Sequence, residues 1–190
     1  VLEKFGFISK KKLSTFGKNN SVLMSHVSHK VNGIKLSTGS LGHGLPVATG
    51  LALANKIKKN NLKTFVLLSD GELQEGSNWE ALLFAAHHKL TNLKIIIDYN
   101  KLQSIDLVKN IVNLEPLEKK LKSFGYKVIS INGHNENEIL RALKLFSTKP
   151  IIIIANTIKG KGVNFMENSI LWHYKNLDKE NYLKALINLK

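Results

Sequence analysis

The feature that most constrains the fold is an alternation of short apolar runs with amphipathic segments, which starts near residue 36. The apolar runs are rich in aliphatic residues and end in polar ones, whereas the segments between them space apolar residues by three and four. Continuous apolar strands that alternate with helices are typical of a parallel sheet covered on both faces. The pattern therefore predicts an α/β fold with strands at 63–68, 93–98, 126–131 and 150–157 and helices at 45–58, 79–89, 115–124 and 136–146.

The length of 190 residues fits one domain, so we expect a single domain over residues 1–190. Leu2, Phe5 and Ile8 fall on one face of a helix, as if the sequence began inside an element, and we expect the domain to be truncated at its N-terminus. No apolar run approaches the roughly 18 residues of a membrane span, which predicts no membrane partner. The chain has no cysteine, and this is compatible with a cytoplasmic location.

The chain is strongly basic, with 28 Lys and Arg against 14 Asp and Glu and a net charge of +14. Only Arg141 is an arginine, although nucleic-acid sites usually depend on arginine for bidentate contacts. The lysines are also spread along the chain. We therefore predict no nucleic-acid partner, and a basic nucleic-acid-binding domain is the least favoured alternative.

Polar residues follow the first two predicted strands, where parallel sheets bind their ligands. Asp70 and Gly71 come after the first strand, and Asn100 comes after the second. A carboxylate, an amide oxygen and a nearby backbone carbonyl are ligands that suit Mg²⁺ beside a phosphate. The next helix is predicted to start near Ser77, with Glu80 as its capping-box partner. A magnesium-diphosphate site is therefore predicted, and the alternative is a pair of ordinary turns.

The segment 37–46 carries closely spaced glycines before a helix of small residues. It lacks the Gly-Lys-Ser/Thr of a Walker loop and does not follow a strand as a dinucleotide-binding loop does. Its small residues would allow a flat ring to come close, but a glycine-rich loop alone is weak evidence.

Three segments taken together resemble transketolases: STGSLGHGLPVATGLALA, SDGELQEGSNWEALLFAAHHKLTNL and IIIDYNKLQS. More narrowly, they resemble the N-terminal, diphosphate-binding half of transketolases that are split over two chains. The later segments EPLEKKLKSFGYKVISINGHN and NTIKGKGVNFMENSILWH fit the same family, so the resemblance covers nearly the whole chain. It implies the thiamine diphosphate-binding fold, with thiamine diphosphate and Mg²⁺ (or Ca²⁺) as cofactors.

The resemblance also implies roles for individual residues. The implied metal ligands are Asp70, Asn100 and the backbone carbonyl of Leu102. The implied cofactor contacts come from Gly39, Ser40, Leu41, Gly71 and His173, with Gly71 as a backbone donor to a phosphate oxygen. The implied catalytic residues are His26 and His173, and Glu75 and Glu80 resemble acidic residues of the subunit interface.

The sequence departs from the family's pattern at a few of these positions. Ser69 stands where a glycine is usual, His43 replaces a glutamine, and His26 is not followed by Pro-Glu. These differences concern the substrate geometry more than the cofactor. The other histidines have plainer readings: His87 and His88 are expected in packing or at an interface, and His134 in a turn.

The activity that the resemblance implies is transfer of a two-carbon ketol unit between ketose and aldose phosphates, as in the pentose phosphate pathway. The glutamate that activates the cofactor belongs to the pyrimidine-binding half, which implies a C-terminal partner subunit, together with an oligomer built across the cofactor interface. We expect this chain to be inactive alone. Two alternatives stay open: another thiamine diphosphate enzyme, such as a deoxyxylulose phosphate synthase, and a non-catalytic scaffold subunit.

Overall fold

The computed structural model describes residues 1–189 and divides into two compact units. The first unit is Val1–His43, and the second begins at Gly44. Each unit has its own core.

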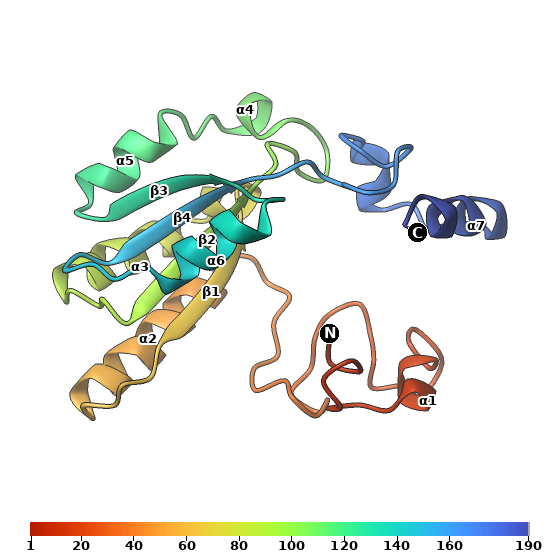
Figure 1. Ribbon diagram of the computed structural model, residues 1–190, viewed down its shortest axis with the longest axis horizontal. Helices are drawn as coiled ribbons and strands as arrows, with labels where there is room; N and C mark the ends of the chain where they lie inside the picture. Colours follow the sequence, from red (N-terminus) through yellow and green to blue (C-terminus); the bar gives the residue numbers. More distant parts are fainter. Residues whose placement is uncertain (190) are drawn as a thin grey trace. The chain divides into compact units, whose positions relative to one another are not determined.

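The second unit is built on a four-stranded sheet in which all neighbours are parallel, in the order β1-β2-β4-β3 (Figure 1). The strands are β1 (Thr64–Ser69), β2 (Leu93–Tyr99), β3 (Lys127–Asn132) and β4 (Ile151–Asn156). All four predicted strands are confirmed. Ser69 pairs with Asp98, and Tyr99 pairs with Asn156, so the carboxyl ends of β1, β2 and β4 lie at one edge of the sheet.

Three helices cover one face of the sheet: α2 (Gly44–Ile57), α3 (Gly76–His87) and α5 (Leu117–Ser123). Their apolar stripes and the alternate side chains of the strands form the larger core. Each large side chain buried here contributes about 1.5–3 kcal/mol through the hydrophobic effect. The fully buried members include Leu45, Leu82, Leu93, Ile95, Ile97 and Leu121.

The other face is covered by α6 (Glu136–Lys144), which packs Ala142 against Ile151 and Ile153. The predicted α/β fold with helices on both faces is therefore confirmed. On the edge strand β1, Phe65 and Leu67 are exposed.

The shorter elements connect or follow the sheet. They are α1 (Lys10–Leu13), η1 (Gly71–Gln74), α4 (Val108–Ile111), η2 (Ile170–His173) and α7 (Lys179–Asn188). In the first unit, Ile8, Leu23 and Val31 form a small core of their own. At the start of this unit, the Phe5 N–H donates to the Val1 carbonyl and the Phe7 N–H to the Leu2 carbonyl, and Gly6 has a φ of +75°, which is the backbone bonding of a helix end. Ile8 is buried but Phe5 is exposed, so the expected apolar face is present only in part.

The start of α3 also differs from the prediction. The helix begins at Gly76 with Glu75 as its N-cap, not at Ser77. The reason is the 3₁₀ turn η1, which follows β1 directly and whose Glu72 carbonyl accepts the N–H of Glu75. The N-cap therefore lies two residues before Ser77, the predicted cap, and Glu75 makes no side-chain capping bond.

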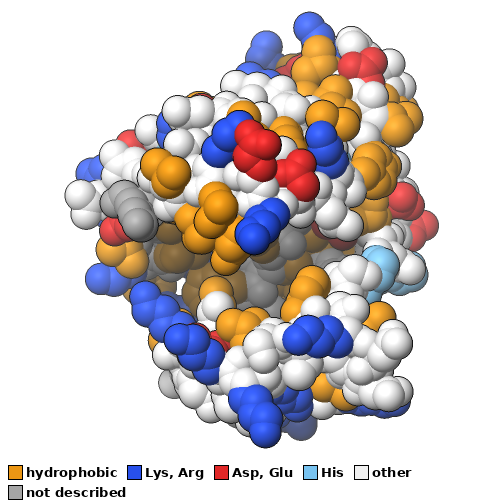
Figure 2. All heavy atoms as spheres, turned by 90° about the vertical axis from the view of Figure 1, so that its right-hand side faces the viewer, with side chains coloured by type: hydrophobic (Ala, Val, Ile, Leu, Met, Phe, Trp, Pro, Cys, Tyr) orange, Lys and Arg blue, Asp and Glu red, His pale blue; other side chains and the backbone are white. Residues whose placement is uncertain are grey.

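The surface of the protein is basic but has no single cationic face in the view of Figure 2. Lysine and arginine side chains lie at separate places there, among apolar and uncharged residues. Within residues 1–189, no helix is long and apolar enough to cross a membrane.

Candidate functional site

Asp70 is held at the junction of two adjacent strand ends. Its backbone N–H donates to the carbonyl of Asp98 on β2, at 3.1 Å. Its carboxylate accepts the N–H of Gly71 on Oδ1 (2.8 Å) and the N–H of Lys101 on Oδ2 (2.5 Å). Since Lys101 lies between Asn100 and Leu102, the structure brings the Asp70 carboxylate to the turn that holds the other two predicted ligands.

The turn after β2 has a defined shape. Lys101 adopts a left-handed conformation with φ of +66°, and the Asn100 Oδ1 atom accepts the N–H of Leu102 at 3.0 Å. Leu102 then pairs with Leu107 in an antiparallel bridge. The backbone therefore reverses direction beside Asp70, and Asn100 has an acceptor oxygen with a second lone pair available.

The electrostatics of this junction suit a cation. Asp70 is fully buried, and its burial raises the pKa of its carboxyl; the nearby Asp98 charge adds to this, whereas the N–H groups of Lys101 and Gly71 oppose it. No ion pair to Asp70 is present among residues 1–189. A buried carboxylate beside a second acid is costly without a compensating positive charge. The donor set thus fits a hard divalent cation.

The site lacks the signature of a closed metal centre. Among the residues that the structure describes, no three His, Asp or Glu side chains are grouped to hold a metal ion. One carboxylate, one amide and backbone oxygens make an incomplete shell. Such a set matches Mg²⁺, which commonly takes its remaining ligands from water and a substrate phosphate.

Two further residues take part that the sequence reasoning missed. Asp98 accepts a hydrogen bond from the Thr157 hydroxyl on Oδ1, and one from the Asn100 amide on Oδ2 at 3.5 Å. Thr157 follows β4, so this network ties the ends of β2 and β4 together and orients Asn100. The sequence shows that Thr157 follows a strand. Its contact with Asp98, however, depends on β4 lying next to β2 in the sheet.

Gly71 stands where its backbone is closely packed. A Cβ atom at this position would lie 3.2 Å from the Cβ of Gln103, closer than an ordinary contact. The Gly71 N–H already donates to Asp70, so a bond to a phosphate oxygen would have to share this hydrogen. Gln103 is itself fixed by a hydrogen bond from its amide to Gln74, at 3.2 Å.

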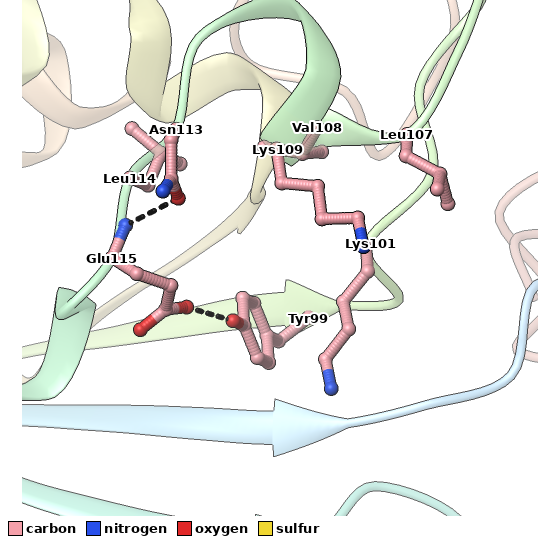
Figure 3. A pocket seen from close by; sticks show the side chains of 8 residues that line it. All are labelled: Tyr99, Lys101, Leu107, Val108, Lys109, Asn113, Leu114 and Glu115. Atoms are coloured by element: carbon pink, nitrogen blue, oxygen red, sulfur yellow. Dashed lines mark hydrogen bonds between the residues drawn. The ribbon is translucent and has the colours of Figure 1, made fainter.

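A pocket of about 530 Å³ opens beside the same turn (Figure 3). Tyr99 and Glu115 point toward one another and are hydrogen-bonded, and the Lys101 ammonium lies 5.3 Å from the centre of the Tyr99 ring. Burial and the Glu115 carboxylate raise the pKa of Tyr99, and the Tyr99 hydroxyl in turn lowers the pKa of Glu115. The pair is therefore a neutral phenol bonded to a carboxylate near neutral pH.

His173 lies at the end of η2 and is next to the loop 159–162. Its Nδ1 atom is 3.4 Å from the Lys159 ammonium. Partial burial and the Lys159 charge lower the pKa of His173, so its imidazole is neutral near pH 7. In the same loop, Lys161 forms an ion pair with Glu167, at 3.4 Å.

The other predicted cofactor residues belong to the first unit. The His26 ring packs on Gly39, where an added Cβ would lie 2.4 Å from the ring's Cδ2 atom. His29 accepts or donates a 2.7 Å bond with Ser37, and the Thr38 N–H donates to the Val27 carbonyl. The histidine segment and the glycine-rich segment therefore lie side by side, and Ser40 and Leu41 are exposed at the end of this pairing.

The remaining histidines and interface acids have simple surroundings. His134 lies in the turn after β3, where its Nε2 atom accepts the N–H of Ile158 at 2.8 Å, as the turn prediction expects. His88 packs on Phe84 with ring centres 4.2 Å apart. Glu75 is the N-cap of α3, Glu80 lies in that helix, and both are exposed.

The chain is similar to the diphosphate-binding part of known transketolases. The family profile "Transketolase, thiamine diphosphate binding domain" matches residues 3–187. The chain is 46% identical over 177 residues to one subunit of the apulose-4-phosphate transketolase of Actinobacillus succinogenes, with 92% of this chain and 64% of that protein covered. It is 38% identical over 189 residues to one subunit of the 6-deoxy-6-sulfo-D-fructose transketolase of a Clostridium species, with 97% of this chain and 69% of that protein covered. The chain thus spans about two thirds of the length of these relatives.

Solved structures give the same result. The fold matches the crystal structure of Campylobacter jejuni transketolase with a TM-score of 0.87 and 34% identity, over 94% of this chain and 30% of that one. With a family profile over almost all of the chain, similar relatives and a matching fold, this protein belongs to the transketolase family, in its thiamine diphosphate-binding domain.

Proposed function

We propose that this chain binds the Mg²⁺ and diphosphate of thiamine diphosphate at the Asp70–Asn100 junction and serves ketol transfer between ketose and aldose phosphates. The observation that carries the proposal is the buried Asp70 carboxylate, which two backbone N–H groups fix beside Asn100 without any cationic partner among residues 1–189. We also propose that residues 1–190 act together as one diphosphate-binding domain.

Each residue of the junction has a defined task in this proposal. Asp70, Asn100 and the Leu102 carbonyl hold the cation, and the hydrogen bonds from Lys101 and Thr157 keep Asp70 and Asp98 oriented. Thiamine diphosphate, when bound, supplies the carbanion chemistry that accepts and releases the two-carbon unit. A neutral His173 is able to accept a proton from a substrate hydroxyl near neutral pH. His26, Gly39, Ser40 and Leu41 are proposed to line the ring and sugar side of the cofactor.

A partner chain completes the proposal. The relatives from Actinobacillus succinogenes and Clostridium are named as subunits of transketolases, which supports a second chain. That chain would carry the pyrimidine-binding half and its activating glutamate. The names of these relatives also support a sugar phosphate or a modified sugar as the substrate, with Glu75 and Glu80 available for a contact between the two chains.

The test is reconstitution of ketol transfer from two separately purified chains. This chain and its proposed pyrimidine-domain partner are assayed alone and mixed, with thiamine diphosphate and Mg²⁺, against a set of ketose and aldose phosphates. Activity is expected only in the mixture.

A pair of matched variants locates the metal site in that assay. Asp70→Asn should abolish activity because a primary oxygen ligand is lost. Asp178→Asn is the control, since Asp178 also accepts a backbone N–H (2.8 Å, from Asn181) but caps α7, and asparagine caps helices well. Transfer by this chain alone, or full activity of Asp70→Asn, would contradict the proposal.

A further inference from the structure

A second pocket lies at the amino edge of the sheet, at the opposite end of the strands from Asp70. It has a volume of about 230 Å³ and is lined by residues that precede or begin β1 and β2, together with residues that follow α6. Lys94 near the start of β2 is six residues before Asn100, which places it about 20 Å from the candidate metal site along the strand. The pocket is therefore separate from the proposed cofactor site.

The floor of this pocket contains a buried lysine. Lys94 is only 3% exposed, and its ammonium donates to the carbonyl of Leu143 in the last turn of α6. The Leu143 carbonyl is one of the last four of α6, which have no partner inside the helix, so this hydrogen bond caps the helix. An ammonium has three N–H donors, and Leu143 is the one acceptor that the structure provides within residues 1–189.

A second cation lies close to the first. Lys63 precedes β1, and its ammonium is 4.2 Å from the centre of the Phe146 ring. Burial and the Lys63 charge together lower the pKa of Lys94. No carboxylate within 4 Å of either ammonium is present in the described part of the chain. Two lysines thus share a recess without a counter-ion.

We infer that this pocket binds a small tetrahedral oxyanion of the phosphate class, free or as part of a small phosphorylated metabolite. Lys94 and Lys63 would supply the charge, and the polar residues Asn61 and Thr91 also line the pocket. The volume is below the roughly 300–1,000 Å³ of pockets for larger organic ligands, which favours a small anion. A dianion here would offset both the burial of Lys94 and the repulsion between the lysines.

The charge of Lys94 also explains why an anion is preferred to a neutral ligand. Hydrogen bonds from an ammonium to an anionic oxygen are shorter and about twice as strong as neutral ones. Asn92 and Ser147, which also line the pocket, already bond to the Ala52 carbonyl and the Lys149 N–H. The two ammonium groups are therefore the main source of binding energy.

The test measures binding of inorganic phosphate and of sulfate to the purified chain by calorimetry, at constant ionic strength set with NaCl because salt screens exposed charges. Four proteins are compared: the native sequence, Lys94→Met, Lys63→Gln and Lys127→Met. Lys127 is the matched control, since it pairs with the same residue, Ile151, as Lys94 does, but is exposed on β3.

The native chain and Lys127→Met should bind phosphate saturably, whereas Lys94→Met and Lys63→Gln should bind it roughly tenfold or more weakly because a charge-assisted bond is lost. Without phosphate, Lys94→Met should unfold at a temperature close to that of the native chain, since removing a buried charge that has no counter-ion offsets the lost hydrogen bond to Leu143. This second readout shows that the weaker binding is not a loss of folding.

A glycerol 3-phosphate titration identifies the source of the oxyanion. Tighter binding than inorganic phosphate supports a phosphorylated metabolite, and equal or weaker binding supports free phosphate. Equal phosphate affinity in the native chain and Lys94→Met would overturn the inference, because the anion would then bind elsewhere. Absence of saturable binding to the native chain would also overturn it.

Discussion

Replacing Gly133 by alanine tests how tightly the strand ends around the site are packed. Gly133 follows β3, and a Cβ atom there would lie 2.4 Å from the Thr157 Cγ2 atom and 3.1 Å from the Asn156 carbonyl oxygen. Thr157 has little freedom to move away, because its hydroxyl donates to Asp98 and its side chain is branched at Cβ. The added methyl group must therefore displace the segment after β4.

The expected cost is that of overpacking a well-ordered region, about 1–3 kcal/mol of unfolding free energy. Gly50 gives the matched control, because it lies inside α2 with no heavy atom within 4 Å of an added Cβ. Alanine there removes the conformational disadvantage of glycine in a helix and should stabilise the chain by about 0.5–1 kcal/mol. The same chemical change should thus have opposite signs at the two positions.

The assay is urea unfolding followed by circular dichroism, with all three proteins measured under the same conditions. The midpoint of unfolding should fall for Gly133→Ala and rise for Gly50→Ala, at similar dependence on urea. If Gly133→Ala is as stable as the native chain, the packing described between β3 and Thr157 is wrong. Gly133→Ala should also weaken Mg²⁺-dependent cofactor binding through Thr157 and Asp98, whereas Gly50→Ala should leave it unchanged.

Three further changes test other parts of the structure. Tyr126→Phe removes a buried 2.8 Å hydrogen bond to the Leu82 carbonyl and should cost about 1 kcal/mol in chemical denaturation. Burial raises the pKa of Tyr126, so the native chain should lose stability as the pH rises above about 10, the ordinary tyrosine pKa. The Phe variant should lose less stability over the same pH range, and equal losses in the two proteins would contradict this. Lys159→Met removes one of the two causes that lower the pKa of His173, so an NMR titration should show that pKa rising, and no change would mean that the two side chains are not close in solution. Leu121→Ala should cost about 2–5 kcal/mol because Leu121 is a fully buried side chain of α5, and a loss below about 1 kcal/mol would indicate that α5 does not pack on the sheet.

The sheet was predictable because its two central strands, β2 and β4, are mostly buried and read as continuous apolar runs. In β4, all residues from Ile151 to Ala155 are apolar and buried. A run of this kind argues against both an amphipathic helix and a strand with one face in solvent. The start of α3 was not predictable in the same way. It depends on η1, which Asp70 caps by accepting the Gly71 N–H and which leads the chain into α3 at Gly76.

The candidate site was predictable in part. Asp70 and Asn100 follow consecutive strands, and parallel neighbours place such residues at one edge. The role of Thr157 was not predictable, since the order of strands along the chain does not reveal that β4 lies between β2 and β3. The burial of Lys94 was not predictable for a similar reason. A lysine inside an apolar run does not show that its ammonium donates to a carbonyl at the end of α6.

The relation of His26 and Gly39 shows a different limit. Their segments are spaced by about a dozen residues and lack a regular periodicity, so only the resemblance to transketolases suggested a common role. The structure places the His26 ring against Gly39 within the first unit. Their approach to the cofactor stays a prediction, which the reconstituted enzyme would test through Gly39→Ala, because an added methyl group would displace His26.

The most direct test of the proposed magnesium-diphosphate site is calorimetric titration of thiamine diphosphate into this chain and its partner, with and without Mg²⁺. Binding should require Mg²⁺ in the native complex and in Asp178→Asn, and it should be lost in Asp70→Asn, because the diphosphate is then without its metal bridge. Cofactor affinity that is independent of Mg²⁺, or unchanged in Asp70→Asn, would contradict a metal site at the ends of β1 and β2.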